Sequence, residues 1–120
     1  MRHPHHARSA GATTRLLCGL AMAFSGLAQA DDAALVARGK VLFTTVKPAC
    51  AVCHTLQAAG SEGQVGPVLD ELKPDAARVL RALHSGLGVM PSYAEQLSEA
   101  DMQALAAFVS HSTGEAPLAR

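Results

Sequence analysis

Aromatic residues, positive charge and long apolar runs are all scarce in this sequence. Its 120 residues include no tryptophan, one tyrosine and three phenylalanines, so any interior must be lined mainly by aliphatic side chains. Ten basic residues are balanced by ten acidic ones, but three of the basic residues precede Asp31, so residues 31–120 have seven basic against ten acidic residues. This net acidic charge argues against a nucleic-acid partner. The apolar run Leu16 to Ala28 is too short to span a bilayer comfortably, and no other segment approaches the length of a transmembrane helix.

The apolar run belongs to a predicted secretory leader. The segment before Asp31 has three arginines and no acidic residue, and Ala28-Gln29-Ala30 is a small-x-small cleavage signal. We therefore expect a cleavable signal peptide over residues 1–30 and one small domain over residues 31–120, which is net acidic. No twin-arginine pair is present, which favours export of the unfolded chain to the periplasm. The cleaved product is expected to be soluble, without stable insertion in a membrane.

The pentapeptide Cys50-Ala51-Val52-Cys53-His54 is typical of an attachment site for c-type haem. Two thiols at this spacing add to the two vinyl groups of one haem, and the adjacent histidine becomes the proximal ligand of the iron. A Cys2His2 zinc site would need two more suitably spaced ligands, but His84 and His111 are far apart. A thioredoxin-like dithiol would need a preceding strand and βαβ patterning, which are absent. We predict one covalent haem c per chain. Once Cys18 leaves with the leader, no third thiol remains.

Hydrophobic periodicity predicts helices and loops without a convincing strand. The last helix has the clearest start, because Ser98 and Asp101 form a capping box. Its apolar stripe is Met102, Leu105, Ala106 and Val109. A first helix is predicted over about 33–46, capped by Asp31-Asp32. The haem motif is expected to open a short helical turn to about Gln57. A further helix should begin at Pro74 and stop at Ser85-Gly86. We predict an all-α fold, a bundle of about four helices wrapped around one covalent haem that supplies much of the core.

The order of these features resembles that of the small, monohaem class I cytochromes c of bacteria, over essentially all of residues 31–114. Cys50, Cys53 and His54 match the family's haem-binding pentapeptide. Three further segments carry the resemblance: Gly66-Pro67-Val68-Leu69 is similar to its Gly-Pro-x-Leu segment, Gly88-Val89-Met90-Pro91-Ser92-Tyr93 to its Met-Pro-x-aromatic loop, and Gly39 with Phe43 to its first helix, facing Leu105 and Phe108. The resemblance implies that the carbonyl of Pro67 accepts a hydrogen bond from the proximal histidine. It also implies that Met90 reaches the iron as sixth ligand.

The candidates for the sixth ligand differ in their surroundings. Met90 lies in a Gly/Pro loop where no packing periodicity requires it, and its thioether is a soft donor suited to reduced iron. Met102 occupies a stripe position of the last helix, which packing explains. His84 is the alternative ligand, with a surface position as its simpler explanation. His111 suits the carbonyl-rich end of its helix.

Two axial ligands, His54 and Met90, leave no open position for a substrate, so the first hypothesis is an electron carrier and not an enzyme. The expected partners are a periplasmic dehydrogenase as donor and a terminal oxidase or another cytochrome as acceptor. Within the family, the segments 66–72 and 88–91 are most similar to cytochromes that accept electrons from enzymes oxidising sulfite or sulfur compounds. The alternatives are a haem enzyme or gas sensor with an open sixth position, or a permanent cytochrome subunit of a larger dehydrogenase.

Overall fold

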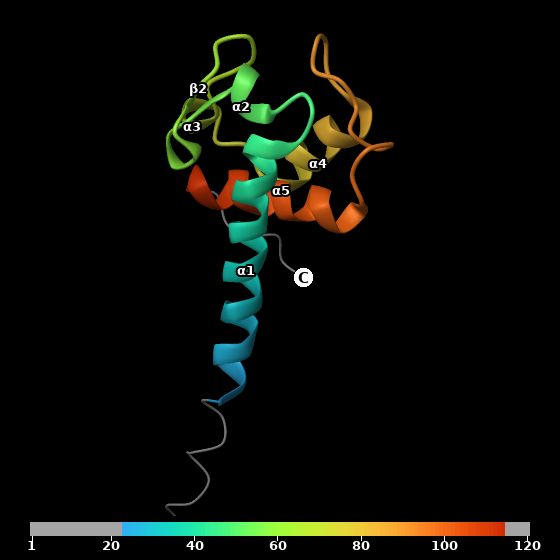
Figure 1. The fold of residues 1–120 in the computed structure, drawn as a ribbon. Coiled ribbons are helices and arrows are strands. Elements are labelled where there is room, and N and C mark those ends of the chain that lie inside the picture. The colour runs from blue at the N-terminus through green and yellow to red at the C-terminus, as the bar shows by residue number, and fades with distance from the viewer. Residues whose placement is uncertain (1–22, 115–120) are drawn as a thin grey trace, which may run out of the picture.

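A computed structural model of the chain describes residues 23–114 (Figure 1). The predicted leader therefore lies largely outside the described residues. In chain order the elements are α1 (Ala23–Thr45), α2 (Cys50–Cys53), β1 (Thr55–Leu56), the 3-10 turn η1 (Gln57–Ala59), β2 (Ser61–Glu62), α3 (Leu69–Leu72), α4 (Ala76–Ser85) and α5 (Glu99–Ser112). The mainly helical fold confirms the predicted all-α class. Within the described segment, no helix has both the length and the apolar character needed to cross a membrane.

The crossing of α1 and α5 organises the core. Figure 1 shows α5 lying across the C-terminal half of α1. The two helices approach closely because Gly39 has no side chain: a Cβ at this position would lie 2.6 Å from the Cβ of Phe108 and closer still to the carbonyl oxygen of Ala104. One turn further on, the rings of Phe43 and Phe108 meet edge to face with centroids 5.7 Å apart. The predicted contact between the first and last helices is present.

The remaining core is mostly aliphatic, as the composition predicts. The four predicted stripe residues of α5 are all buried, and α4 contributes Leu83 from its own apolar face. Leu56 and Leu69 close the core beneath the short elements that follow the haem motif. The buried cluster consists of Phe43, Val46, Leu56, Leu69, Leu83, Tyr93, Met102, Leu105, Phe108 and Val109.

Two predicted helix starts are wrong. Helix α1 begins at Ala23 and runs through Asp31 and Asp32, so neither residue caps it. Residues 27–30 are Leu, Ala, Gln and Ala, which are good helix formers, and in the uncleaved chain the helix extends upstream through them. Helix α4 begins at Ala76, because the carboxylate of Asp75 accepts a hydrogen bond from the backbone N–H of Arg78 at 2.6 Å. Pro74 therefore precedes the cap and is not the first helical residue.

The predicted helical turn at the haem motif is present but ends earlier than Gln57. Helix α2 ends at Cys53, and the chain then extends into β1, which pairs with antiparallel β2 through Thr55 opposite Glu62 and Leu56 opposite Ser61. Gly60 has a left-handed backbone (φ 63°) and allows the tight reversal between the strands. Strands of two residues carry too little alternation to be detected as a pattern in the sequence.

Candidate haem site

Helix α2 places the two predicted haem-binding thiols one turn apart at the edge of the core. Cys50 and Cys53 are free thiols, each half-buried, and Cys50 packs against the hydrophobic cluster. Burial raises the pKa of the Cys50 thiol to about 11, and the neighbouring Cys53 adds to the rise, against a lowering backbone hydrogen bond. The turn is closed by the backbone N–H of His54, which donates to the carbonyl oxygen of Cys50 at 3.0 Å. The motif thus presents both sulfur atoms and the adjacent imidazole from a single turn.

The imidazole of His54 is oriented by a backbone carbonyl. Its Nδ1 lies 2.9 Å from the carbonyl oxygen of Pro67. A carbonyl oxygen only accepts hydrogen bonds, so Nδ1 carries the proton and Nε2 keeps its lone pair for a metal. A carbonyl behind a ligating imidazole is the usual way in which proteins set ring orientation and tautomer. This is the hydrogen bond that the resemblance implies.

Two glycines make room for the motif. A Cβ on Gly66 would lie 2.5 to 3.0 Å from three atoms of the His54 ring, and a Cβ on Gly63 would lie 2.6 Å from backbone atoms of Val52, Cys53 and His54. The backbone N–H of Gly66 also donates to the carbonyl oxygen of Cys53 at 2.8 Å. The glycine-rich loop therefore packs directly on the haem-binding turn, and the ring of His54 occupies space that a side chain on Gly66 would fill.

Ser61 is a further positioning residue that the sequence did not reveal. Its buried hydroxyl donates to the carbonyl oxygen of His54 at 2.9 Å and accepts from the backbone N–H of Leu56 at 3.1 Å. These bonds satisfy backbone groups of His54 and Leu56 and hold β1 against β2. The only signal in the sequence is a small polar residue after Gly60, which occurs in many turns.

The loop that carries Met90 is held at both ends. Leu87 and Met90 exchange two backbone hydrogen bonds of 3.0 Å each, and the reversal starts at Gly86, whose φ is 69°. A Cβ at Gly86 would lie 2.7 Å from the carbonyl oxygen of Met90. The side chain of Met90 is half-buried and packs against the same hydrophobic cluster as Cys50. The loop thus brings the thioether of Met90 to the edge of the core.

Ser92 and Tyr93 tie this loop to the rest of the site. The hydroxyl of Ser92 donates to the carbonyl oxygen of His84 at 2.6 Å. The hydroxyl of the buried Tyr93 donates to the carbonyl oxygen of Pro48 at 2.7 Å, which links the Met90 loop to the segment just before the two thiols. Burial raises the pKa of Tyr93 to about 12, with smaller contributions from Cys50 and Cys53, so this hydroxyl remains a donor at neutral pH.

The other ligand candidates have partners or positions of their own. Met102 is only 3% exposed and belongs to the core. The ring of His84 is exposed, and its Nε2 lies 3.1 Å from a carboxylate oxygen of Glu99 at the start of α5. His111 is exposed in the last turn of α5.

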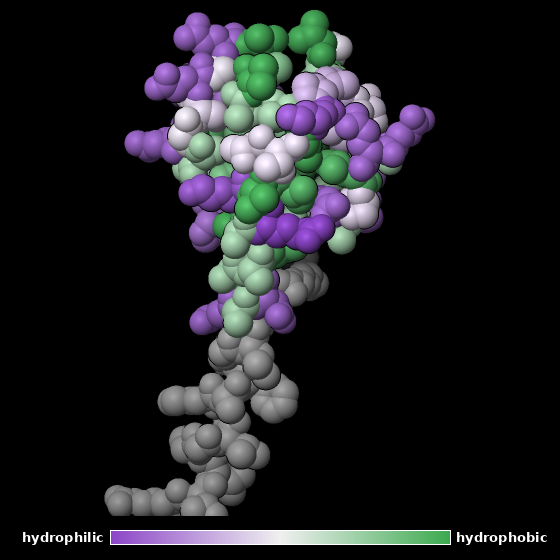
Figure 2. Space-filling view, viewed as in Figure 1, coloured by the Kyte–Doolittle hydropathy of each residue, from purple (hydrophilic) through white to green (hydrophobic). Residues whose placement is uncertain are grey.

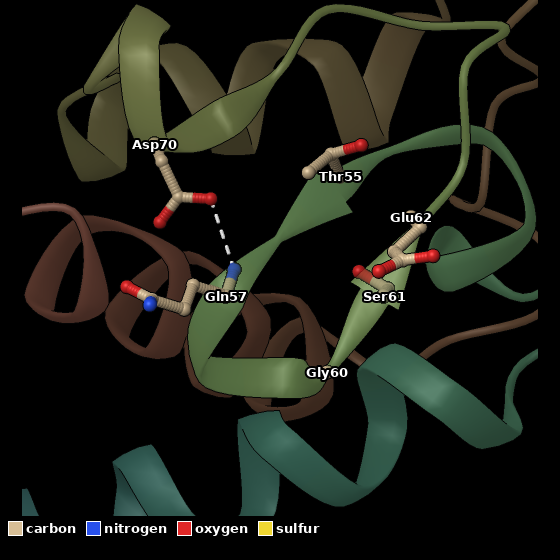
Figure 3. A pocket seen from close by; sticks show the side chains of 6 residues that line it. All are labelled: Thr55, Gln57, Gly60, Ser61, Glu62 and Asp70. Atoms are coloured by element: carbon tan, nitrogen blue, oxygen red, sulfur yellow. Dashed lines mark hydrogen bonds between the residues drawn. The ribbon is translucent and has the colours of Figure 1, made fainter.

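A shallow pocket of about 430 Å³ lies beside the β1–β2 hairpin and is separate from these residues (Figure 3). In it, Asp70 of α3 accepts a hydrogen bond from the backbone N–H of Gln57 at 2.9 Å. Its lining residues are Thr55, Gln57, Gly60, Ser61, Glu62 and Asp70. The carboxylate of Asp70 serves to hold α3 against η1, and none of the predicted haem-site residues reaches this pocket.

Two thiols and a histidine on one turn, with Nε2 free and a glycine beneath the ring, fit covalent attachment of a haem through Cys50 and Cys53. When bound, the haem supplies one-electron redox chemistry at its iron. The fold and the site together define a c-type cytochrome.

The comparisons with known proteins place this cytochrome in a family. The chain belongs to the family described as cytochrome C oxidase, cbb3-type, subunit III, whose model matches residues 34–109. It is similar to the c-type cytochrome SorU from Sinorhizobium meliloti, with 45% sequence identity and a TM-score of 0.64, over 68% of this chain and 93% of that one. The chain is thus a small class I cytochrome c that binds haem c covalently and carries electrons.

Proposed function

We propose that this protein is a periplasmic electron carrier that transfers one electron at a haem c ligated by His54 and Met90. The observation that carries the proposal is the hydrogen bond from Nδ1 of His54 to Pro67, which prepares Nε2 as an axial ligand. Met90 is the matching candidate for the opposite side, because backbone and side-chain hydrogen bonds fix its loop and its thioether has no other polar role. Two axial ligands of this kind favour ferrous iron and leave no position for a substrate.

The proposed location is the periplasm. The leader would direct export of the chain and would then be cleaved after Ala30. The support is the arrangement of arginines, apolar run and small-x-small signal in residues 1–30. The proposed domain is then residues 31–120. Cleavage would shorten α1 to residues 31–45, the part of the helix that contains Gly39 and Phe43 and packs on α5.

The proposed electron donor is a periplasmic dehydrogenase, for which an enzyme that oxidises sulfite or another sulfur compound is the first candidate. The proposed acceptor is a terminal oxidase or another cytochrome. The support is the similarity of residues 66–72 and 88–91 to cytochromes that serve such enzymes, together with the likeness to SorU over most of its length. Reduction of the purified cytochrome by such a dehydrogenase and its substrate, followed as the haem spectrum in stopped flow, tests this part.

Substitution of Met90 by alanine tests the ligand and separates a carrier from an enzyme or sensor. The oxidised wild-type protein should show the weak far-red charge-transfer band of iron–sulfur bonding and should bind carbon monoxide poorly when reduced. Met90→Ala should abolish the band, open the iron to small ligands and lower the midpoint potential by on the order of 0.1 V.

Met102→Ala is the matched control, because it removes the same side chain from the core. It should keep the band and cost only stability, about 2 to 5 kcal/mol for a buried methionine. A wild-type protein that is high-spin and binds carbon monoxide readily would overturn the carrier assignment in favour of a haem enzyme or gas sensor. Retention of the band in a His84→Ala variant would further exclude His84 as the ligand.

A further inference from the structure

The two proposed axial ligands come from parts of the molecule that are far apart in sequence. His54 follows α2, and Met90 lies in the loop between α4 and α5. Figure 1 shows these parts on two sides of the upper end of the molecule, and Figure 2 shows hydrophobic side chains on both of them. Binding of both ligands to one iron therefore needs a contact that holds the two sides at a fixed separation.

Tyr93, three residues after Met90, has a partner for each of its hydrogen-bonding groups. Its backbone N–H donates to the carbonyl oxygen of Leu83 in α4 at 2.8 Å. Its own carbonyl oxygen accepts from the backbone N–H groups of Gln96 and Leu97 at 3.0 and 2.9 Å. The side chain is only 3% exposed and belongs to the hydrophobic cluster. The backbone of Tyr93 thus fixes the base of the Met90 loop to the helix before it and to the segment that leads into α5.

The hydroxyl of Tyr93 reaches the other side of the site. It donates to the carbonyl oxygen of Pro48 at 2.7 Å, across 45 positions of sequence. Pro48 lies between α1 and α2, shortly before Cys50, and Figure 1 shows this segment curving toward the loop between α4 and α5. Within the described part of the chain, the other hydrogen bonds of residues 86–97 stay inside this loop or end on α4. The phenol O–H is therefore the polar contact that joins the Met90 loop to the haem-binding segment.

We propose that Tyr93 is a positioning residue for electron transfer, whose hydroxyl clamps the Met90 loop to the haem-binding segment and thereby keeps the thioether on the iron. The inference rests on the proposed function, because it takes Met90 as the sixth ligand. A thioether is a soft donor that binds oxidised iron less well than reduced iron, so the loop must hold it in place in the oxidised state. Phenylalanine would keep the packing of this ring but could not form the bond.

The hydrogen bond of Ser92 cannot replace this clamp. Ser92 donates to the carbonyl oxygen of His84 at 2.6 Å, but both residues are exposed, so water takes over when the bond breaks. This bond also joins the loop only to α4, the helix from which the loop starts. The bond of Tyr93 is part-buried, and breaking it with the loop in place would leave a donor and a carbonyl without partners, which is costly.

Cyanide binding to the oxidised holoprotein tests the clamp, because cyanide reaches the iron only when Met90 leaves it. Stopped-flow absorption gives the rate from the loss of the far-red band. Tyr93→Phe should bind cyanide about three- to tenfold faster than the wild type, as expected when the closed loop loses one hydrogen bond. The band and the midpoint potential before cyanide is added should be those of the wild type, since the closed state still predominates.

Ser92→Ala and Thr113→Val are the matched controls, because each also removes one hydroxyl. Ser92→Ala should bind cyanide within about twofold of the wild-type rate, since its hydrogen bond is exposed. Thr113 is buried at the end of α5, where its hydroxyl donates to the carbonyl oxygen of Val109 at 3.0 Å. Thr113→Val measures the effect of general destabilisation, so it should unfold at a lower urea concentration without faster cyanide binding.

The unsubstituted protein offers a second test, because Tyr93 is its only tyrosine. The ultraviolet resonance Raman bands of tyrosine report whether the hydroxyl donates a hydrogen bond. They should show a donated bond in the oxidised protein and its loss when cyanide displaces Met90.

Three results would each overturn the inference: cyanide binding at the wild-type rate in Tyr93→Phe, an equal acceleration in either control, or Raman bands that do not change with cyanide. A wild-type protein without the far-red band would count against the proposed function instead, so the two failures can be distinguished.

Discussion

The ring of His54 is positioned from two directions. The carbonyl of Pro67 accepts its Nδ1 proton at 2.9 Å, and Gly66 leaves the space in which the ring lies. Such a hydrogen bond contributes only about 0.5 to 1.5 kcal/mol to stability, so its main effect is on tautomer and orientation. The backbone of His54 is fixed independently by the hydroxyl of Ser61. Small changes at these neighbours should therefore affect the haem more than the fold.

Gly66→Ala tests this positioning. The new Cβ would lie 2.5 Å from Cε1 of His54, so the ring must rotate or the loop must move away. We expect haem to be attached still, with an altered midpoint potential and a larger high-spin fraction. Optical spectra and potentiometry measure both. Gln64→Ala, an exposed position in the same loop, should change neither, and a Gly66→Ala protein with wild-type spectrum and potential would show that the glycine is not needed by the ring.

At the scale of single residues, the sequence indicates the haem-binding candidates more clearly than it indicates the residues that position them. Cys50, Cys53 and His54 are recognisable because haem attachment requires three fixed residues in five. The role of Pro67 follows only from resemblance, since any carbonyl could serve. Ser61 is invisible in the sequence, because its hydroxyl acts on backbone groups that come together only when β1 and β2 pair.

The crossing of α1 and α5 depends on one glycine, and Gly39→Ala tests it. In an exposed helix this substitution would stabilise by up to about 1 kcal/mol through helix propensity. Here the added Cβ meets backbone atoms of Ala104 and the Cβ of Phe108, which cannot rotate away, so the helices must separate. We expect a net destabilisation of about 1 to 3 kcal/mol, typical of overpacking, in urea unfolding of the holoprotein. Lys40→Ala, at the exposed neighbour, is the control, and a stabilised Gly39→Ala protein would contradict the close approach.

An ion pair also joins these two helices. Arg38 of α1 donates to the carboxylate of Asp101 in α5, with Nε to Oδ1 at 2.7 Å. The hydrogen bond from Arg38 is the largest effect and lowers the pKa of Asp101 below its ordinary value. Desolvation opposes it, and the hydrogen bond with Ser98 and the charge of Arg38 add smaller lowering effects. Because the folded pKa lies below the unfolded one, the pair stabilises the fold above about pH 4, the ordinary aspartate pKa, and the contribution is lost as pH falls through the folded value.

Arg38→Gln should therefore destabilise the protein at pH 7 and have a smaller effect near the acid end of the stability curve. Urea unfolding of wild type and variant across pH measures the difference in free energy of unfolding. Arg81→Gln, at an exposed position of α4, is the control. Its difference in free energy of unfolding from the wild type should not become smaller as the pH falls. A difference for Arg38→Gln that stays constant down to the lowest measurable pH would show that the pair does not depend on the Asp101 charge.

Helix ends were predictable where the local residues alone decide them. Ser98 accepts from the backbone N–H of Asp101 at 3.1 Å, and α5 begins at the next residue, as the capping pattern predicts. The side chain of Asp101, however, reaches Arg38, which is 63 positions away and not inferable from local pattern. The predicted start of α1 was wrong for another reason. Asp31-Asp32 can cap a helix only when no helix-forming residues precede it, and here such residues precede it and continue the helix upstream.

The hydrophobic core of the described residues is small and contains few aromatic side chains. Its buried cluster contains only two phenylalanines and one tyrosine, and the haem motif packs along the cluster edge through Cys50 and Ala51. A covalent haem at this edge adds apolar contact that a domain of this size otherwise lacks. Haem and fold should therefore be mutually dependent.

Replacing Cys50 and Cys53 by alanine tests this dependence. The variant, exported in a host that attaches haem c, should be largely unfolded by circular dichroism, because the covalent group no longer completes the core. The wild-type protein should keep its colour in acidified organic solvent, since thioether bonds survive. Haem that is extracted from the wild type by this solvent would contradict covalent attachment, and a fully folded, haem-free variant would contradict the dependence.

The pairing of the first and last helices also sets an order of events in time. Gly39 and Phe43 meet Ala104 and Phe108, so a chain that emerges N-terminus first cannot form this crossing until nearly all of its residues are out. Until then Cys50 has no completed core to pack against, and both thiols stay open to the machinery that joins them to haem. The topology thus delays its own closure and gives cofactor attachment a period in which the chain is still accessible.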